Sequence, residues 1–268
     1  MRPVPVLMYH HVSPHKGDMV STAPDVFEWQ MRRMKEAGYR SLDASELLGV
    51  ISGEYSPQER CALITFDDGY LDNFVYAFPV LKKYGIRALI FAVTDWVDGA
   101  EDEGMPRGAL LDEFKKSPPT HDGCKRLMEK GSHSLVSIDW AMASEMKASG
   151  LIEIGSHTKS HRSAGRLSRE ELNYELEGSK KRITERLGGC DSLCWPKGSF
   201  TPEAIDAARK TGYKAVFTTR PGVVRNGSDR FSIDRIVAKD SAGWLEKRLR
   251  LYTNPLLSRL YLMTKAKR

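Results

Sequence analysis

Short apolar runs alternate with helix-like segments along this chain, and the alternation limits its fold more than any other feature. The runs at residues 61–66 and 87–94 are largely apolar, as expected of strands buried on both faces of a sheet. Strands are expected at 4–9, 61–66, 87–94, 152–155, 192–195, 215–219 and 231–237, and helices at 25–37, 44–51, 72–84, 138–149, 168–187 and 202–211. The pattern predicts an α/β fold, a distorted (β/α) barrel of about seven parallel strands.

Polar motifs follow two of these strands directly. Asp67 and Asp68 come after the run 61–66, and His157 and His161 follow the strand 152–155. Asp67 and Asp68 are neighbours, so they point in different directions; one can bind a metal ion while the other accepts a proton. Each motif alone has an ordinary explanation, a helix cap for the aspartates and chance for the histidines. Together they favour metal-assisted hydrolysis.

Three motifs resemble the successive motifs of the polysaccharide deacetylases, the family 4 carbohydrate esterases. They are Thr-Phe-Asp-Asp-Gly-Tyr at 65–70, His-Thr-Lys-Ser-His at 157–161 and Trp-Pro-Lys-Gly at 195–198. The resemblance covers about residues 4–240. It implies a barrel fold and hydrolysis of an N-acetyl group on an amino-sugar glycan. It also implies that Asp67 is the general base, and that Asp68, His157 and His161 bind a divalent metal, most commonly zinc.

The same motif positions imply contacts with the substrate from Tyr70, Trp195 and Lys197. A backbone N–H near Lys197 is expected, by analogy with the family, to hold the oxyanion of the tetrahedral intermediate. Lys197 stands where an aromatic residue is usual in the family. Its ammonium group could meet an anionic part of the substrate, although a lysine at a surface is most often simply solvated.

The general acid departs from the usual family pattern. Most members supply it from a late Leu-x-His motif, but this chain has no histidine after His161. Its first predicted strand ends in Tyr-His-His-Val at 9–12, which resembles the opening of the poly-N-acetylglucosamine deacetylase branch. In that branch the motifs are circularly rearranged and an early histidine is the acid. The resemblance implies that His10 is the acid; a structural histidine is the alternative, and His11 should point the other way.

The partner of the base also departs from the pattern. Cys194 stands where many members have an arginine that pairs with the base. Arg235 lies in a late segment, 231–236, that resembles the arginine-bearing motif of the same branch, and we expect it to replace the missing partner. Two alternatives stay open: Asp234 could orient His10, and Arg235 could form an ordinary structural ion pair.

The C-terminal segment carries the net charge of the chain. The formal net charge is +6, and residues 241–268, with seven basic residues and one acidic residue, account for all of it. Residues 244–263 mix basic and large apolar side chains, which is typical of a peripheral helix on anionic lipid. A helix packed on the barrel with a basic outer face is equally open. Nucleic acid is not expected as a partner, because the basic residues are few, terminal and mixed with aliphatic ones.

Three regions are therefore expected: a barrel over residues 1–240, an insertion at 98–136 over the site, and a basic amphipathic tail at 241–268. The first residues do not resemble a secretion signal, so we expect a cytoplasmic protein, on the inner face of the membrane if the tail binds lipid. A lipid-linked glycan intermediate of envelope or lipopolysaccharide synthesis would suit that location. The alternatives are a deformylase or cyclic-amide hydrolase with the same site, or a catalytically silent glycan- or lipid-binding protein.

Overall fold

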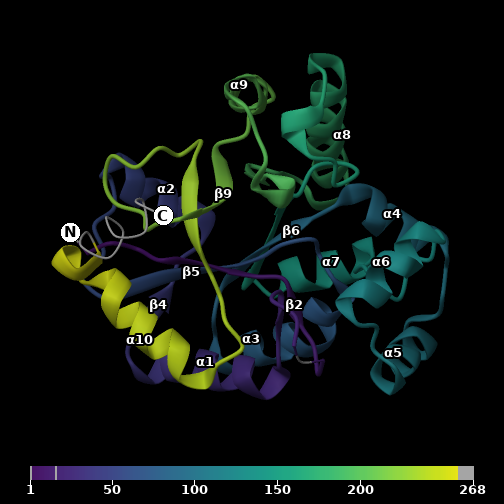
Figure 1. Cartoon of the computed structure of the whole chain (residues 1–268), viewed down its shortest axis with the longest axis horizontal. Coiled ribbons are helices and arrows are strands. Elements are labelled where there is room, and N and C mark those ends of the chain that lie inside the picture. The colour runs from purple at the N-terminus through teal and green to yellow at the C-terminus, as the bar shows by residue number, and fades with distance from the viewer. Residues whose placement is uncertain (1, 16, 259–268) are drawn as a thin grey trace.

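A closed barrel of seven parallel strands forms the centre of the computed structural model, which describes residues 2–15 and 17–258 (Figure 1). The strands are β1 (Val6–Tyr9), β5 (Arg60–Phe66), β6 (Ala88–Ala92), β7 (Ile152–Ser156), β8 (Ser192–Cys194), β9 (Ala215–Pro221) and β10 (Ile233–Val237). Each pairs with the next in parallel, and β1 closes the barrel by pairing with both β10 and β5. The predicted (β/α) barrel is confirmed.

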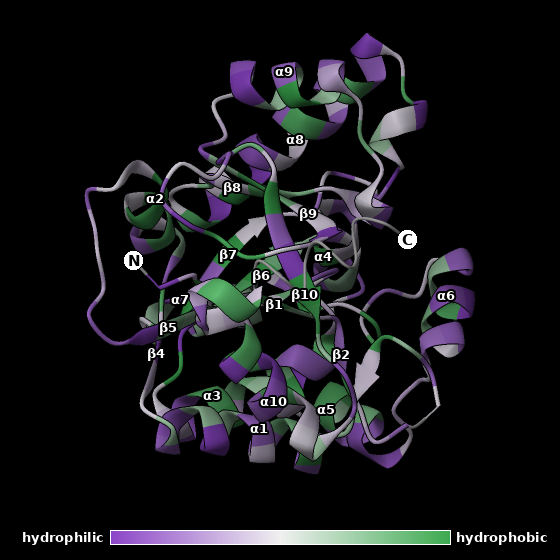
Figure 2. Ribbon diagram, turned by 60° about the vertical axis from the view of Figure 1, so that its left-hand side comes forward, coloured by the Kyte–Doolittle hydropathy of each residue, from purple (hydrophilic) through white to green (hydrophobic). Residues whose placement is uncertain are grey.

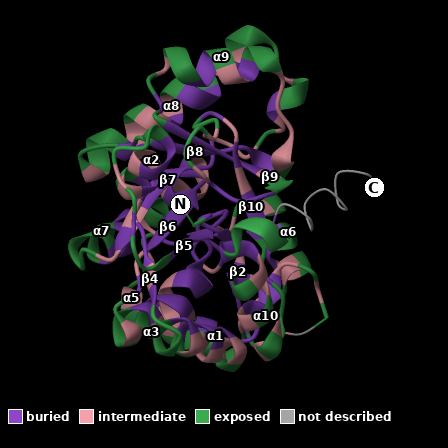
Figure 3. Ribbon diagram, turned by 90° about the vertical axis from the view of Figure 1, so that its left-hand side faces the viewer, coloured by how far each residue is buried: buried purple, intermediate pink, exposed green. Residues whose placement is uncertain are grey.

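The strand register explains why the apolar runs are continuous. Leu7 of β1 lies opposite Ile236 on one side and Ile64 on the other. Such strands bury one face inside the barrel and the other under the helices, so consecutive residues are all apolar. Apolar residues accordingly concentrate on the central strands in Figure 2, and Figure 3 shows the same strands as buried.

Three short strands were not predicted from the sequence. β4 (Tyr39–Ser41) pairs in parallel with the first half of β5, and β2 (His11–Val12) pairs with β3 (Ser21–Thr22) outside the barrel. They are only two or three residues long, too short to show a periodicity.

The helices pack around the barrel, with α8 and α9 on one side and α1, α3 and α10 on the opposite side (Figure 1). They are α1 (Pro24–Glu36), α2 (Ala44–Ser52), α3 (Phe78–Tyr84), α4 (Thr94–Asp102), α5 (Arg107–Lys116), α6 (His121–Glu129), α7 (Trp140–Ala148), α8 (Arg169–Leu187), α9 (Pro202–Lys210) and α10 (Ala242–Thr253). A π-helical turn, η1 (Asn73–Ala77), precedes α3, and short 3₁₀ turns occur at η2 (Ala164–Arg166) and η3 (Pro196–Gly198). The capping box expected at Ser168 is present, with Glu171 as its partner.

The segment 98–136 folds into helices rather than loops, because α4 runs into it and α5 and α6 lie within it. Its end is tied to the chain that follows β5. The backbone N–H of Leu71 donates to the carbonyl of Val136 (2.8 Å), and that of Ile138 donates to the carbonyl of Gly69 (3.1 Å). The insertion is therefore fastened directly to the loop that carries the aspartate pair.

The described part of the tail packs on the barrel. Leu245, Leu249 and Tyr252 of α10 are buried, and α10 lies along α1 (Figure 1). These apolar side chains therefore face protein, as in the packed-helix alternative. Leu256 and Leu257 beyond α10 are exposed, and residues 259–263 of the predicted lipid-binding segment lie outside the described residues. Among the helices described, none has the length and apolar character needed to cross a bilayer.

Candidate active site

The loop after β5 turns its two aspartates in different directions. The backbone N–H of Asp67 donates to the carbonyl of Tyr9 (3.0 Å), which continues the β1–β5 ladder and keeps Asp67 at the end of the barrel. Asp68 has a left-handed backbone, with φ of 74°. Non-glycine residues seldom adopt this conformation, and it redirects the Asp68 side chain. The two adjacent carboxylates therefore reach different partners.

Asp67 forms a buried ion pair with Arg235 of β10. The guanidinium binds the carboxylate in a bidentate fashion, with Nη1–Oδ1 at 2.6 Å and Nη2–Oδ2 at 2.7 Å. Arg235 is completely buried and also donates to the carbonyl of Thr218 (2.8 Å) and to Thr65 Oγ1 (3.0 Å). Burial alone would raise the pKa of Asp67, but Arg235 outweighs it and lowers that pKa. Asp67 is therefore ionised at neutral pH.

Asp68, His157 and His161 bring three potential ligand atoms together. Asp68 Oδ1 lies 3.2 Å from His157 Nε2 and 3.1 Å from His161 Nε2, and all three atoms lie within 4.8 Å of one another. Burial alone would raise the pKa of Asp68, but the two histidines hold it well below its usual value.

These three residues fit a divalent cation. His157 Nδ1 donates to the carbonyl of Cys194 (2.9 Å), which fixes the ring with its Nε2, the atom that would bind an ion, turned toward Asp68. Asp68 Oδ1 is buried and has no hydrogen-bond partner within the described chain. A carboxylate and two imidazole nitrogens that converge in this way form a donor set that zinc commonly uses.

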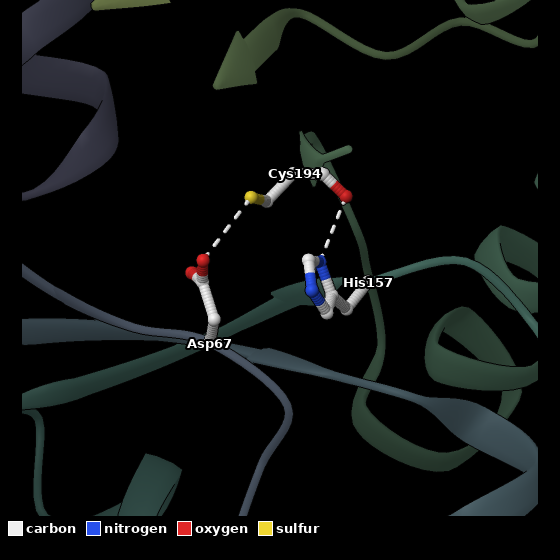
Figure 4. Close-up of side chains that lie close together, drawn as sticks. All are labelled: Asp67, His157 and Cys194. Atoms are coloured by element: carbon white, nitrogen blue, oxygen red, sulfur yellow. Dashed lines mark hydrogen bonds between the residues drawn. The ribbon is translucent and has the colours of Figure 1, made fainter. Parts of the chain in front are cut away.

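A second trio, Asp67, His157 and Cys194, also lies close together (Figure 4). This trio already has its cation. Arg235 Nη2 lies 3.0 Å from Cys194 Sγ, while both Nη atoms bind Asp67. The Cys194 thiol thus occupies a position beside the Asp67–Arg235 pair, and metal binding falls to the Asp68 trio.

His10 lies beside the Asp67 carboxylate at the end of β1. Its Nε2 is 3.8 Å from Asp67 Oδ2, and its side chain is 22% exposed. Burial lowers the pKa of His10, and Asp67 acts in the opposite direction. Asp234 does not orient His10, because its carboxylate contacts Arg220 (3.3 Å) and Thr218 Oγ1 (3.4 Å). That alternative is wrong.

The three residues predicted to contact the substrate differ in their exposure. Trp195 is completely buried and stacks on Phe200 with ring centroids 6.0 Å apart, and its expected contact with substrate stays a prediction. Tyr70 is 5% exposed and stacks on His11, and its contact with substrate stays a prediction. Lys197 is exposed and has a left-handed backbone, and its contact with substrate stays a prediction.

Two features near the site were missed from the sequence. Trp96 of α4 is half-buried, with its ring centroid 5.1 Å from that of His161. Asp72 lies two residues after Tyr70 and binds His11 Nδ1 through Oδ2 at 2.6 Å. Asp72 could have been suspected from the sequence, because it lies close after the aspartate pair. Trp96 lies near the start of the weakly periodic segment that precedes the insertion helices, and no local pattern indicates its role.

Comparison with known proteins identifies the family. The family model described as polysaccharide deacetylase matches residues 54–216. The chain belongs to the polysaccharide deacetylase family. The expected family and the expected enzyme class, a carbohydrate deacetylase, are confirmed.

Individual relatives of this deacetylase family member extend the match. The polysaccharide deacetylase-like protein YxkH of Bacillus subtilis is 30% identical over 234 residues, which are 87% of this chain and 70% of YxkH. The poly-beta-1,6-N-acetyl-D-glucosamine N-deacetylase of Escherichia coli is 24% identical over 86% of this chain, which corresponds to 36% of that protein. The structure of the Streptococcus pyogenes deacetylase PplD shares the fold, with a TM-score of 0.75 at 23% identity over 94% of this chain and 99% of PplD.

Proposed function

We propose that this protein is a metal-dependent deacetylase that removes the N-acetyl group from an amino sugar in a glycan. The observation that carries the proposal is the division of labour between neighbouring aspartates. Asp68 joins His157 and His161 in a trio of metal-ligand type, while Asp67 stays outside that trio as an ionised carboxylate held by Arg235. A hydrolase of this kind needs both a ligand set and a free base.

Asp68, His157 and His161 would hold the ion, for which we propose zinc, and the ion would supply Lewis acidity toward the acetyl carbonyl and the attacking water. Asp67 accepts the proton of that water as its oxygen attacks the acetyl carbon. Arg235 holds the carboxylate ionised and fixes its position. The lowered pKa of His10 leaves it mostly neutral at neutral pH. His10 therefore receives the proton that it delivers to the leaving nitrogen, and Asp67, 3.8 Å away, is placed to pass it on. The C–N bond breaks, giving acetate and a free amine.

For the substrate, we propose a lipid-linked amino-sugar glycan, an intermediate of envelope or lipopolysaccharide synthesis met at the cytoplasmic face of the membrane. The activity named for the Escherichia coli relative, on poly-N-acetylglucosamine, supports the sugar class. The exposed Leu256 and Leu257, which follow the basic helix α10, support a peripheral contact with lipid. We further propose that the exposed Lys197 meets an anionic group of such a carrier.

The test is acetate release from N-acetylated amino-sugar oligomers by the zinc-loaded protein. We expect turnover that a chelator abolishes and added zinc restores. Asp67→Asn should lose activity, whereas Asp206→Asn, an exposed aspartate on α9, should retain it. Substantial turnover by Asp67→Asn would disprove the base assignment.

Product analysis addresses the rival functions. Formate or a ring-opened acid in place of acetate would indicate a deformylase or a cyclic-amide hydrolase. Binding of the oligomer by the zinc-loaded protein without any turnover would indicate a silent glycan-binding protein, for which the replaced motif residues Cys194 and Lys197 are the motivation.

A further inference from the structure

Asp72 and Asn73 tie down the turn that carries His10. Asp72 Oδ2 accepts from His11 Nδ1 at 2.6 Å, and its Oδ1 accepts the backbone N–H of Val12 at 3.3 Å. Asn73 Nδ2 donates both to Asp72 Oδ1 and to the carbonyl of His10, each at 2.8 Å. Asp72 and Asn73 are buried, so these bonds are shielded from competing water. The backbone that follows His10 is thus held by two adjacent side chains.

The ring of His10 depends on this support. In the region that the structure describes, it makes no hydrogen bond of its own, and Asp67 Oδ2 at 3.8 Å is its charged neighbour. A proton donor misplaced by about 1 Å can lose about 100-fold in rate. The position of His10 must therefore come from its backbone.

The insertion contacts His11 through the first residue of α6. His121, the first residue of α6, places its Nδ1 3.2 Å from His11 Nε2. A face of the His11 ring stacks on Tyr70, with ring centroids 3.6 Å apart. Burial alone would lower the pKa of His11, but the Asp72 carboxylate raises it, because it stabilises the protonated ring. His11 is thus enclosed by Asp72, Tyr70 and His121.

We propose that Asp72 is a positioning residue for His10, acting through His11 and Asn73, and that the insertion contributes His121 to the same device. The assignment of His10 as the acid rests on the proposed function; the positioning of its ring does not. On this view the insertion takes part in the arrangement of the site. It sets the geometry of proton delivery.

The kinetic test compares Asp72→Ala and His121→Ala with a matched control, His15→Ala. His15 also joins the N-terminal loop to the insertion, through its Nε2 and the carbonyl of Pro118 (2.7 Å), but it does not contact His11. We expect kcat to fall tenfold or more, to about 100-fold, in Asp72→Ala and less in His121→Ala, with KM and bound zinc unchanged. His121→Asn, which can still hydrogen-bond to His11, should recover part of the loss, and His15→Ala should match the wild type. Zinc lost in parallel with activity, or an unchanged kcat in Asp72→Ala, would overturn the proposal.

A second readout separates this inference from the proposed function. Ring resonances of His10 in NMR spectra of the metal-free protein should form one sharp set in the wild type and in His15→Ala. In Asp72→Ala they should broaden or double, because the ring samples more than one position. Sharp, unshifted His10 resonances in folded Asp72→Ala would refute the positioning role, even if the wild type proved to have no deacetylase activity.

Discussion

Replacement of Arg235 by methionine tests how the base is held. The change removes the guanidinium but keeps an unbranched apolar side chain in a completely buried position. It deletes both guanidinium hydrogen bonds to Asp67 and leaves that carboxylate, with 3% of its side chain exposed, without its arginine partner. Breaking a buried ion pair from one side costs about 3–5 kcal/mol, because the remaining charge is neither hydrated nor paired. We expect the free energy of unfolding to fall by about that amount.

The double variant Asp67→Asn/Arg235→Met isolates the pair. Neutralising the stranded carboxylate removes the main penalty, so the double variant should be more stable than Arg235→Met by at least about 1 kcal/mol. The control is Arg220→Met, because Arg220 is an exposed arginine that contacts Asp234 at 3.3 Å and should contribute less than about 1 kcal/mol. The assay is urea unfolding of the metal-free proteins at neutral pH, followed by tryptophan fluorescence.

Two outcomes would refute this reasoning. One is a loss of less than about 1 kcal/mol in the free energy of unfolding for Arg235→Met, which would show that the pair contributes no more than a surface salt bridge. The other is a double variant less stable than Arg235→Met, which would show that Arg235 stabilises the barrel through Thr218 and Thr65 rather than through Asp67.

Three further measurements address other parts of the molecule. Burial raises the pKa of Glu153 in β7 from 4.5 to about 6, so the ionisation of Glu153 destabilises the fold as the pH rises through that interval. Glu153→Gln should therefore stabilise the protein by up to about 2 kcal/mol near pH 8 in urea unfolding. An equal gain in stability near pH 5 would show that burial of the charge is not the cause. His10→Ala should lower kcat by about 100-fold or more with bound zinc unchanged, and parallel loss of zinc would make His10 a ligand. Replacing Leu256 and Leu257 by serine should weaken sedimentation with anionic vesicles while the melting temperature stays the same; unchanged binding would exclude these two residues from a lipid contact.

Local patterns in the chain were sufficient to predict the barrel. A strand buried on both faces must be apolar at every position, so the runs at 61–66 and 87–94 could be recognised without any partner. The α8 capping box involves residues three apart, and the aspartate pair follows its strand directly. Each of these signals lies within a few residues of sequence, and the carboxyl ends of parallel strands then place the motifs on one face of the barrel.

Which side chains meet on that face depends on the tertiary structure, and the Asp67–Arg235 pair was expected from the family resemblance rather than from any local pattern. Arg235 and Asp67 are 168 residues apart, and their bidentate contact exists because β1 closes the barrel between β5 and β10. His11 and His121 are 110 residues apart and meet because the insertion folds back over the motif loop. The sequence determined the strands and the chemistry at their ends; barrel closure, a cooperative property of all seven strands, determined the partners and buried Trp195 where its motif had suggested a substrate contact.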